Sequence, residues 1–364
     1  MSGRLLYTAA VPFESARRVS VLPDGHRARR LHGHSFLAKI RAELPVGWSS
    51  FPGAELDTVR DQLISTVAPL DFQSLNDIVA EPTDENLARW VRKAIRTPGV
   101  EQIGIQSTTH SGVDLDPRDH SHIWRRFLLQ SAHQLPNVPP GHKCGRMHGH
   151  GFEILLHANQ DLGAKALGID YDLIDKLWEP IHRELDHACL NDVPGLSNPT
   201  SEVIAAWLWG RIKPELPTLS WVTVYETAQC GANYDGNQYR IWKEVTLDSS
   251  LALRFAPRND PRHRIHGHTY TLRLHLCAPL DEVMGWTVDF GDVKDLFTPV
   301  FKRIDHRPLH ELPGLEQPDV ASLAHWIRKE VASLLPSADR LDLYETRGCG
   351  AILSWGGADI ALPI

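Results

Sequence analysis

The sequence lacks the features that mark several protein classes. It has no apolar run of the roughly 18 to 20 residues that a membrane-spanning helix needs, and its first residues lack the basic-then-apolar order of a signal peptide. Its formal net charge of −7 argues against a nucleic-acid-binding surface. Its five cysteines form no CxxC pair and give no disulfide framework: Cys144, Cys189, Cys230, Cys277 and Cys349. We therefore expect a cytoplasmic protein that binds a small molecule, and neither a membrane nor a nucleic acid.

Histidine, by contrast, is abundant, with 20 residues in a chain of 364. The tripeptide His-Gly-His occurs at 32–34, 148–150 and 266–268, with spacings of 116 and 118 residues. An aliphatic residue followed by aspartate keeps nearly the same phase, at Leu70-Asp71, Leu185-Asp186 and Ile304-Asp305. This period is the size of one small domain, so the sequence predicts three copies of one unit.

The expected domains are residues 1–120, 121–240 and 241–364, called repeats 1, 2 and 3. No linker rich in glycine, serine or proline separates them, so we expect the copies to pack side by side. Patterning in repeat 2 predicts a ββααββ unit with strands over 123–132, 148–158, 220–227 and 237–245, and helices over 172–185 and from 198 onward. Three such α+β units could pair edge to edge and close as a twelve-stranded antiparallel barrel with the helices outside. A linear string of domains is the alternative.

The His-Gly-His motif of repeat 2 is a candidate metal site. On a strand, residues i and i+2 point to the same face, so His148 and His150 can converge on one ion. His133, at the end of the preceding strand, is available as a third ligand. Three neutral imidazoles with an open fourth position are typical of catalytic zinc. A histidine pair alone is more often simply a polar strand.

Repeat 2 resembles the 6-pyruvoyl-tetrahydropterin synthase family, and looks closest to its bacterial 6-carboxytetrahydropterin synthases. The similarity covers the whole repeat and is carried by the segments 131–135 (SAHQL), 141–150 (GHKCGRMHGH), 185–192 (LDHACLND), 198–202 (NPTSE) and 225–227 (YET). The resemblance implies a T-fold and one zinc ion per chain, held in the middle repeat by His133, His148 and His150. It also implies that Cys144 is the proton-abstracting base, that Asp186 and His187 form its proton relay, and that Glu226 anchors the pterin ring.

The activity implied by the resemblance is that of a zinc-dependent carbon–carbon lyase. The substrate would be 7,8-dihydroneopterin triphosphate, converted to 6-carboxytetrahydropterin, acetaldehyde and triphosphate on the route to 7-deazapurines such as queuosine. Two alternatives stay open: the pyruvoyl-forming reaction of the same family, and a non-catalytic pterin- or zinc-binding protein. Family members stack two trimeric rings, so by analogy two of these chains could form a homodimer.

Each candidate residue also has an ordinary interpretation. Cys144 could be a small buried hydrophobe, although a nearby cation would lower its thiol pKa and favour a role as base. Asp186 and His187 could brace the end of a helix instead of relaying protons. Glu226 could simply be exposed on its strand, but a carboxylate accepts two parallel N–H bonds from a guanidine-like pterin edge.

Repeats 1 and 3 have lost parts of the set. In repeat 1, Arg17, Ala28, Phe72 and Ser107 stand at the positions of His133, Cys144, His187 and Glu226. In repeat 3, Leu251 and Arg262 replace His133 and Cys144, while Asp305, His306 and Glu345 are kept. We expect the flanking His-Gly-His motifs to be remnants without metal. Six arginines of the flanking repeats are candidates to contact the triphosphate, although most could form surface ion pairs: Arg27, Arg29, Arg30, Arg258, Arg262 and Arg264.

Overall fold

The computed structural model describes residues 3–160 and 168–356. Each repeat contributes four strands and two helices. Repeat 1 contains β1 (Arg4–Arg17), β2 (His32–Ala42), α1 (Glu55–Val67), α2 (Asp84–Ala94), β4 (Val100–Thr108) and β5 (Ser111–Leu115), with a two-residue strand β3 (Gln73–Ser74) beside β1. Repeat 2 contains β6 (Ser121–His133), β7 (His148–Gln160), α3 (Tyr171–Leu185), α4 (Ser201–Ile212), β8 (Leu219–Thr227) and β9 (Cys230–Tyr234). Repeat 3 contains β10 (Tyr239–Leu251), β11 (His266–Cys277), α5 (Phe290–Ile304), α6 (Val320–Val331), β12 (Ala338–Thr346) and β13 (Cys349–Ser354).

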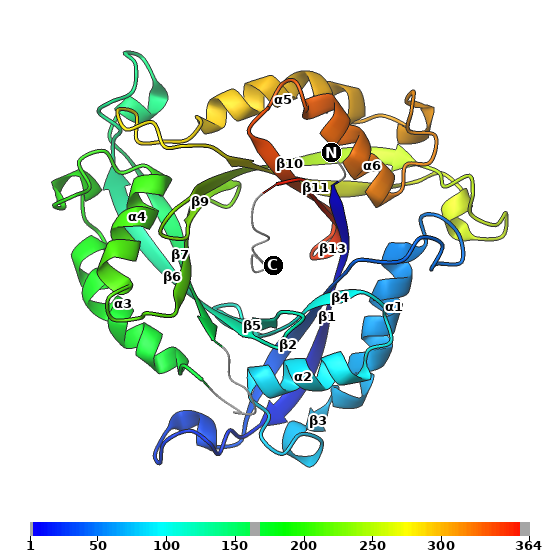
Figure 1. Cartoon of the computed structure of the whole chain (residues 1–364), viewed down its shortest axis with the longest axis horizontal. Coiled ribbons are helices and arrows are strands. Elements are labelled where there is room, and N and C mark those ends of the chain that lie inside the picture. The colour runs from blue at the N-terminus through cyan, green and yellow to red at the C-terminus, as the bar shows by residue number, and fades with distance from the viewer. Residues whose placement is uncertain (1–2, 161–167, 357–364) are drawn as a thin grey trace.

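All strands except the two-residue β3 form one closed antiparallel barrel of twelve strands, as the sequence predicted (Figure 1). Neighbouring repeats join by pairing of β5 with β6 and of β9 with β10. The ring closes where β1 pairs with β13, from Arg4 opposite Ser354 to Thr8 opposite Gly350. This last pairing rules out a linear string of domains, and among residues 3–160 and 168–356 it leaves no long edge strand exposed.

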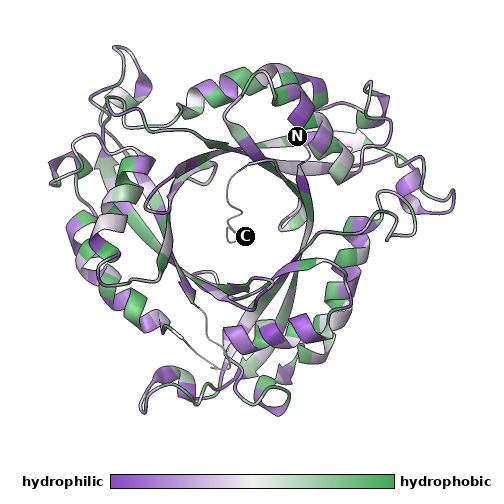
Figure 2. Cartoon of the chain, viewed as in Figure 1, coloured by the Kyte–Doolittle hydropathy of each residue, from purple (hydrophilic) through white to green (hydrophobic). Residues whose placement is uncertain are grey.

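The helices lie outside the barrel and cover its outer face (Figure 1). Strand residues alternate between the two faces, so Phe36, Ala38 and Ile40 of β2 pack in the core under the helices. The residues between them face the other way, and one of them, Lys39, forms a buried ion pair with Asp114 at 2.9 Å. Figure 2 shows hydrophobic and hydrophilic residues on each helix, as expected for helices with one face against a barrel.

The structure corrects one detail of the sequence prediction. The fourth strand of repeat 2 is the short β9, and the segment predicted over 237–245 belongs to β10, the first strand of repeat 3. A five-residue strand that contains glycine gives a weaker sequence pattern than the longer strand that follows it. In α3, Ile174, Trp178, Ile181 and Leu185 form the buried stripe, and Leu173 is 43% exposed.

Candidate metal and substrate site

The three predicted metal ligands of repeat 2 come together at one end of β6 and β7. The strands pair in register, with His133 opposite His148, so the third ligand stands directly beside the His-Gly-His pair. The ring centroids of His133, His148 and His150 are 4.5, 5.1 and 4.9 Å apart, and one nitrogen of each ring lies within 4.8 Å of the others. This spacing is compatible with one shared zinc ion, which binds imidazole nitrogens at roughly 2.0–2.1 Å.

Hydrogen bonds orient two of these rings for metal binding. Nδ1 of His133 lies 2.9 Å from the carbonyl of Pro199, and Nδ1 of His148 lies 2.8 Å from the carbonyl of Arg146. Such bonds place the proton on Nδ1 and leave Nε2 as a lone-pair donor. Nε2 of His133 and Nε2 of His150 are buried and have no hydrogen-bond partner in the described part of the chain. Buried nitrogens without partners fit a bound cation, because unsatisfied polar atoms are otherwise costly.

His148 and His150 border a cavity of about 690 Å³ between repeats 2 and 3, here called cleft 2/3, and His133 lies buried beside them. Cys144 and Glu226 also line it, so the structure brings five of the seven predicted site residues to one place. Glu226 accepts a hydrogen bond from Ser201 Oγ at 2.8 Å, and its other oxygen lies 3.6 Å from His150 Nε2. The carboxylate therefore lies between the histidines and the start of α4.

Cys144 lies in a one-turn helix at Lys143–Gly145, where its N–H donates to Nδ1 of His142 at 3.2 Å. His142 in turn approaches Asp289 of repeat 3, with Nε2 to Oδ2 at 3.2 Å. Burial, followed by the charge of Glu226, raises the pKa of the Cys144 thiol, while Lys143 acts in the opposite direction. Burial and Glu226 thus favour the thiol form of Cys144, and Lys143 favours the thiolate.

Repeat 3 supplies the opposite wall of cleft 2/3, through residues that include Trp286 and Lys294. Its loop is fastened to the start of α4, since Glu202 accepts from the Thr287 N–H at 2.9 Å and Asn198 donates to the Met284 carbonyl at 2.7 Å. Burial raises the pKa of Glu202 to about 7. Repeat 3 therefore completes the cleft. The six arginines of the flanking repeats that were candidates to contact the triphosphate do not line it.

Four cations line cleft 2/3 without a carboxylate in ion-pair distance among the described residues: Lys143, Arg146, Lys243 and Lys294. Sequence analysis missed all four, and also Ser201. Lys243 and Lys294 belong to repeat 3, about 100 to 150 residues from Cys144 in the chain, and no local motif marks them. The four cations can contact a substrate that carries several negative charges, although Glu202, Glu226 and Asp289 line the same cavity.

Asp186 and His187 do not line cleft 2/3. His187 Nδ1 lies 2.7 Å from Asp186 Oδ2, and its side chain is 79% exposed. Asp186 accepts from the Gln130 N–H at 2.9 Å, which lowers its pKa and ties the end of α3 to β6. Asp305 and Asp71 accept equivalent bonds from strand N–H groups, and the residues after them, His306 and Phe72, are likewise exposed with positive φ. In each repeat, the aspartate after the first helix thus bonds to a strand N–H, and the residue that follows it projects into solvent.

Equivalent elements meet at two further interfaces. Cleft 1/2, between repeats 1 and 2, has a volume of about 650 Å³, and cleft 3/1 has about 120 Å³. In the parts of the chain that the structure describes, the His-Gly-His residues of repeats 1 and 3 belong to no cluster of three possible metal ligands. Burial lowers the pKa of His34 and of His268 to about 4.

Fold and site together define a tandem T-fold protein with a candidate active cleft at one of its three interfaces. The family model for 6-pyruvoyl tetrahydropterin synthase matches residues 7–112, 122–237 and 240–354. The chain belongs to this family, and it carries the family domain three times. Within the described residues, none of the helices has the length and apolar character needed to cross a membrane.

Two relatives matched by sequence agree with this assignment. The chain is 35% identical over 119 residues to a Synechocystis 6-carboxy-5,6,7,8-tetrahydropterin synthase, covering 31% of this chain and 91% of that protein. It is 30% identical over 119 residues to a dihydroneopterin monophosphate aldolase of Pyrococcus furiosus, covering 32% of this chain and 97% of that protein. The solved structure of 6-pyruvoyl tetrahydropterin synthase from Caenorhabditis elegans matches with 21% identity and a TM-score of 0.28, over 30% of this chain and 90% of that one.

Proposed function

We propose that the protein is a zinc-dependent 6-carboxytetrahydropterin synthase with one active site, in cleft 2/3. The observation that carries this proposal is the convergence of three imidazoles, two with unpartnered buried nitrogens, beside a cysteine and a glutamate in one cavity. His133, His148 and His150 hold the zinc. When bound, zinc polarises oxygens of the substrate side chain and acidifies the adjacent C–H bonds.

Glu226 orients the heterocycle. Its side chain is only 15% exposed and is fixed by Ser201, so the ionised carboxylate can accept two parallel N–H bonds from the pterin edge. Cys144 accepts a proton from the substrate side chain in its thiolate form, which Lys143 favours and which a zinc ion bound by the neighbouring histidines would favour further. The wall formed by repeat 3 covers the bound ring and excludes water.

The unpaired cations favour a triphosphate over a monophosphate substrate. Lys143, Arg146, Lys243 and Lys294 offer about four positive charges to match the several negative charges of a triphosphate. The relative named as a dihydroneopterin monophosphate aldolase therefore indicates a related reaction class, while the charge of this cleft indicates 7,8-dihydroneopterin triphosphate.

Asp186 and His187 lie outside cleft 2/3, so a proton relay requires that the same two residues of a second chain reach the cleft. Supporting this, the residues just before the three His-Gly-His motifs are apolar and exposed by 59%, 52% and 69%: Leu31, Met147 and Ile265. Together with exposed Phe72, they give one end of the barrel an apolar rim from which His187 and His306 also project. Two chains stacked through this rim would form a homodimer.

Product analysis tests the proposed activity. Zinc-loaded protein incubated with 7,8-dihydroneopterin triphosphate is expected to release acetaldehyde and triphosphate in equal amounts and to form 6-carboxytetrahydropterin. Release of triphosphate without acetaldehyde would identify the pyruvoyl-forming reaction. No turnover of the zinc-loaded protein would favour a non-catalytic pterin-binding role.

A further inference from the structure

Cleft 1/2 keeps almost the volume of cleft 2/3 but cannot hold the same metal site. Arg17 stands where His133 stands in repeat 2, and its Nη1 donates to Asp84 at 2.7 Å and to the Pro82 carbonyl at 2.8 Å. Its Nη2 lies 3.4 Å from Nε2 of His34. A buried guanidinium thus occupies the place of the third ligand, and Ala28 replaces the thiol. The cleft is open and has no catalytic set of the proposed kind.

Clefts 1/2 and 2/3 both have a hydroxyl–carboxylate hydrogen bond at the base, but the strand and the helix supply opposite partners in the two clefts. In cleft 2/3 the helix residue Ser201 donates to the strand residue Glu226. In cleft 1/2 the strand residue Ser107 donates to the helix residue Asp84 at 2.7 Å. Tyr171 of repeat 2 donates to the same Asp84 oxygen at 3.2 Å. With Arg17 on its other oxygen, Asp84 already accepts three hydrogen bonds from the protein, so its orientation is fixed and most of its acceptor capacity is used.

Glu85, next along α2, is the acceptor that remains. It lines cleft 1/2, is 3% exposed, and is hydrogen-bonded to Thr83 and to its own N–H. In repeat 2 the residue equivalent to Glu85 is Glu202, which accepts a hydrogen bond from the hydroxyl of Thr287 in repeat 3. The residue equivalent to Thr287 in repeat 2 is Gly168, which has no hydroxyl to donate to Glu85. Burial raises the pKa of Glu85 to about 7. A carboxyl group with spare acceptor capacity suits the N–H edge of a heterocycle.

The mouth of cleft 1/2 carries two cations at the positions of Lys143 and Arg146. Arg27 and Arg30 line the cavity, are exposed, and have no carboxylate in ion-pair distance within the described ranges. A third cation of cleft 1/2, Arg125, is neutralised by two hydrogen bonds to Asp175. In cleft 2/3 the residues at these two positions are Lys243 and Lys294, and neither has a carboxylate in ion-pair distance among the described residues. Cleft 1/2 therefore suits fewer phosphate groups.

The acidic residues on the facing wall do not cancel these arginines. Asp172 lies 3.1 Å from Nε2 of His26, a contact that joins repeat 2 to repeat 1. Asp170 accepts from the Asp172 N–H at the start of α3. Among the described residues, neither carboxylate lies in ion-pair distance of Arg27 or Arg30, so both guanidinium groups can contact an incoming anion.

We infer that cleft 1/2 is a second, non-catalytic ligand site, which binds a small phosphorylated N-heterocycle between the carboxyl group of Glu85 and the guanidinium groups of Arg27 and Arg30. The heterocycle presents N–H donors to the base of the cleft, and its phosphate lies at the mouth. Arg17 fills the metal position, so the ligand is retained without turnover.

Isothermal titration with guanosine 5′-monophosphate tests this site in the intact zinc-loaded chain. The double variant Arg27→Ala/Arg30→Ala is expected to bind about tenfold more weakly, because it removes charge-assisted hydrogen bonds. Glu85→Gln should also weaken binding, with its melting temperature confirming that the fold persists. The matched control, Arg254→Ala/Arg258→Ala, removes the same charge from the exposed loop of repeat 3 and should leave the affinity unchanged.

Two results would overturn the inference. One is the absence of binding up to about 1 mM nucleotide, a concentration that corresponds to very weak affinity. The other is binding that is lost in Lys143→Ala/Arg146→Ala but not in Arg27→Ala/Arg30→Ala, which would assign the nucleotide to cleft 2/3. Pterin turnover is measured separately, so failure of this inference leaves the proposed activity untouched.

Discussion

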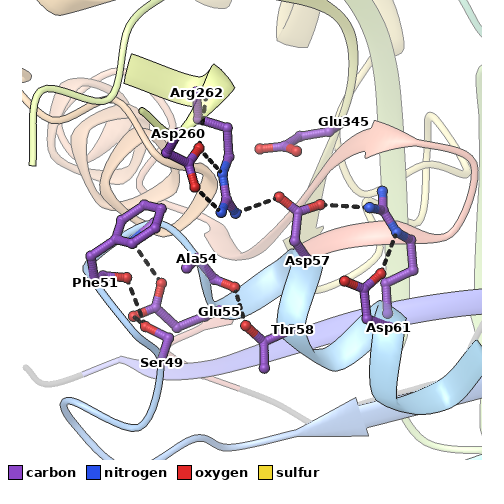
Figure 3. A network of polar contacts seen from close by, with 12 residues as sticks. Ser49, Phe51, Ala54, Glu55, Asp57, Thr58, Asp61, Asp260, Arg262 and Glu345 are labelled. Atoms are coloured by element: carbon purple, nitrogen blue, oxygen red, sulfur yellow. Dashed lines mark hydrogen bonds and ion pairs between the residues drawn. The ribbon is translucent and has the colours of Figure 1, made fainter. Parts of the chain in front are cut away.

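Clefts 2/3 and 3/1 are built from equivalent strands and helices, yet one is open and the other is closed. In cleft 3/1, Arg262 stands at the position of Cys144 and bonds to Asp57 of α1 at 2.7 Å and to Asp260 at 2.8 Å (Figure 3). Arg60 extends the network by bonding to Asp57 at 2.8 Å. The side chain of Arg262 thus occupies space that a substrate would need. The fold places a cleft at each of the three interfaces, and the side chains determine how large the cleft is and what it can bind.

The largest expected effect comes from making repeat 2 resemble repeat 3. His133→Leu introduces the residue found at position 251, and should abolish both zinc retention and turnover because two imidazoles hold zinc weakly. Since Leu251 is accommodated in the same strand position of β10, the fold should persist. Zinc content and activity check the prediction. In the control His266→Ala, both should be unchanged; a zinc loss there would contradict the contrast between the repeats.

Replacing the thiol should separate chemistry from metal binding. We expect Cys144→Ala to lower kcat by about 10²- to 10⁴-fold, the usual contribution of a general base, with zinc still bound. Cys277→Ala, which removes a half-buried thiol elsewhere in repeat 3, serves as the control. Unchanged kcat in Cys144→Ala would eliminate this residue as the base.

Glutamates at equivalent positions should differ in their effect on substrate affinity. Glu226→Gln keeps the shape but removes the charge that accepts two N–H bonds, so KM should rise by about tenfold or more. The same substitution at the equivalent residue of cleft 3/1, Glu345→Gln, should leave KM unchanged. Equal effects of both variants would mean that neither residue anchors the pterin.

Glu345→Gln should instead alter stability in a pH-dependent way. Burial, and then the charge of Asp57, raises the pKa of Glu345 to about 7 from an ordinary 4.5. The folded state therefore binds more protons than the unfolded state between these values, and stability falls as pH rises through this window. The variant should gain about 3 kcal/mol over the wild type at pH 8 and less than about 1 kcal/mol at pH 5, by denaturant unfolding. The exposed control Glu311→Gln should show no such difference; a gain for Glu345→Gln that is equal at both pH values would refute the assignment.

Opening cleft 3/1 should have the smallest effect. Arg262→Ala removes a partly exposed ion pair, so the free energy of unfolding should fall by about 0.2–1 kcal/mol. Neither zinc content nor activity should increase, because Leu251 still replaces the third ligand. The control Arg183→Ala removes a more exposed pair with Glu179, whose side chains are 72% and 65% exposed, and should change stability less. Gain of a second metal ion in Arg262→Ala would contradict this account of the repeats.

The sequence predicted the parts of the molecule that depend on local periodicity. The His-Gly-His repeat and strand alternation gave three copies, a closed barrel and the group of His133, His148 and His150. The resemblance to a known family added Cys144 and Glu226, which line the same cavity. Residues that meet across an interface could not be found this way. Lys294 and Trp286 reach cleft 2/3 only because β9 pairs with β10, and no pattern near them in the chain reports that contact.

The measurement that tests the central claim most directly is the metal content of the intact chain, after zinc saturation and dialysis. We predict one zinc ion per chain, because one of three interfaces has a complete set of ligands. Three ions per chain would mean that the flanking histidine pairs also bind metal, and none would mean that the histidines of repeat 2 do not form a zinc site.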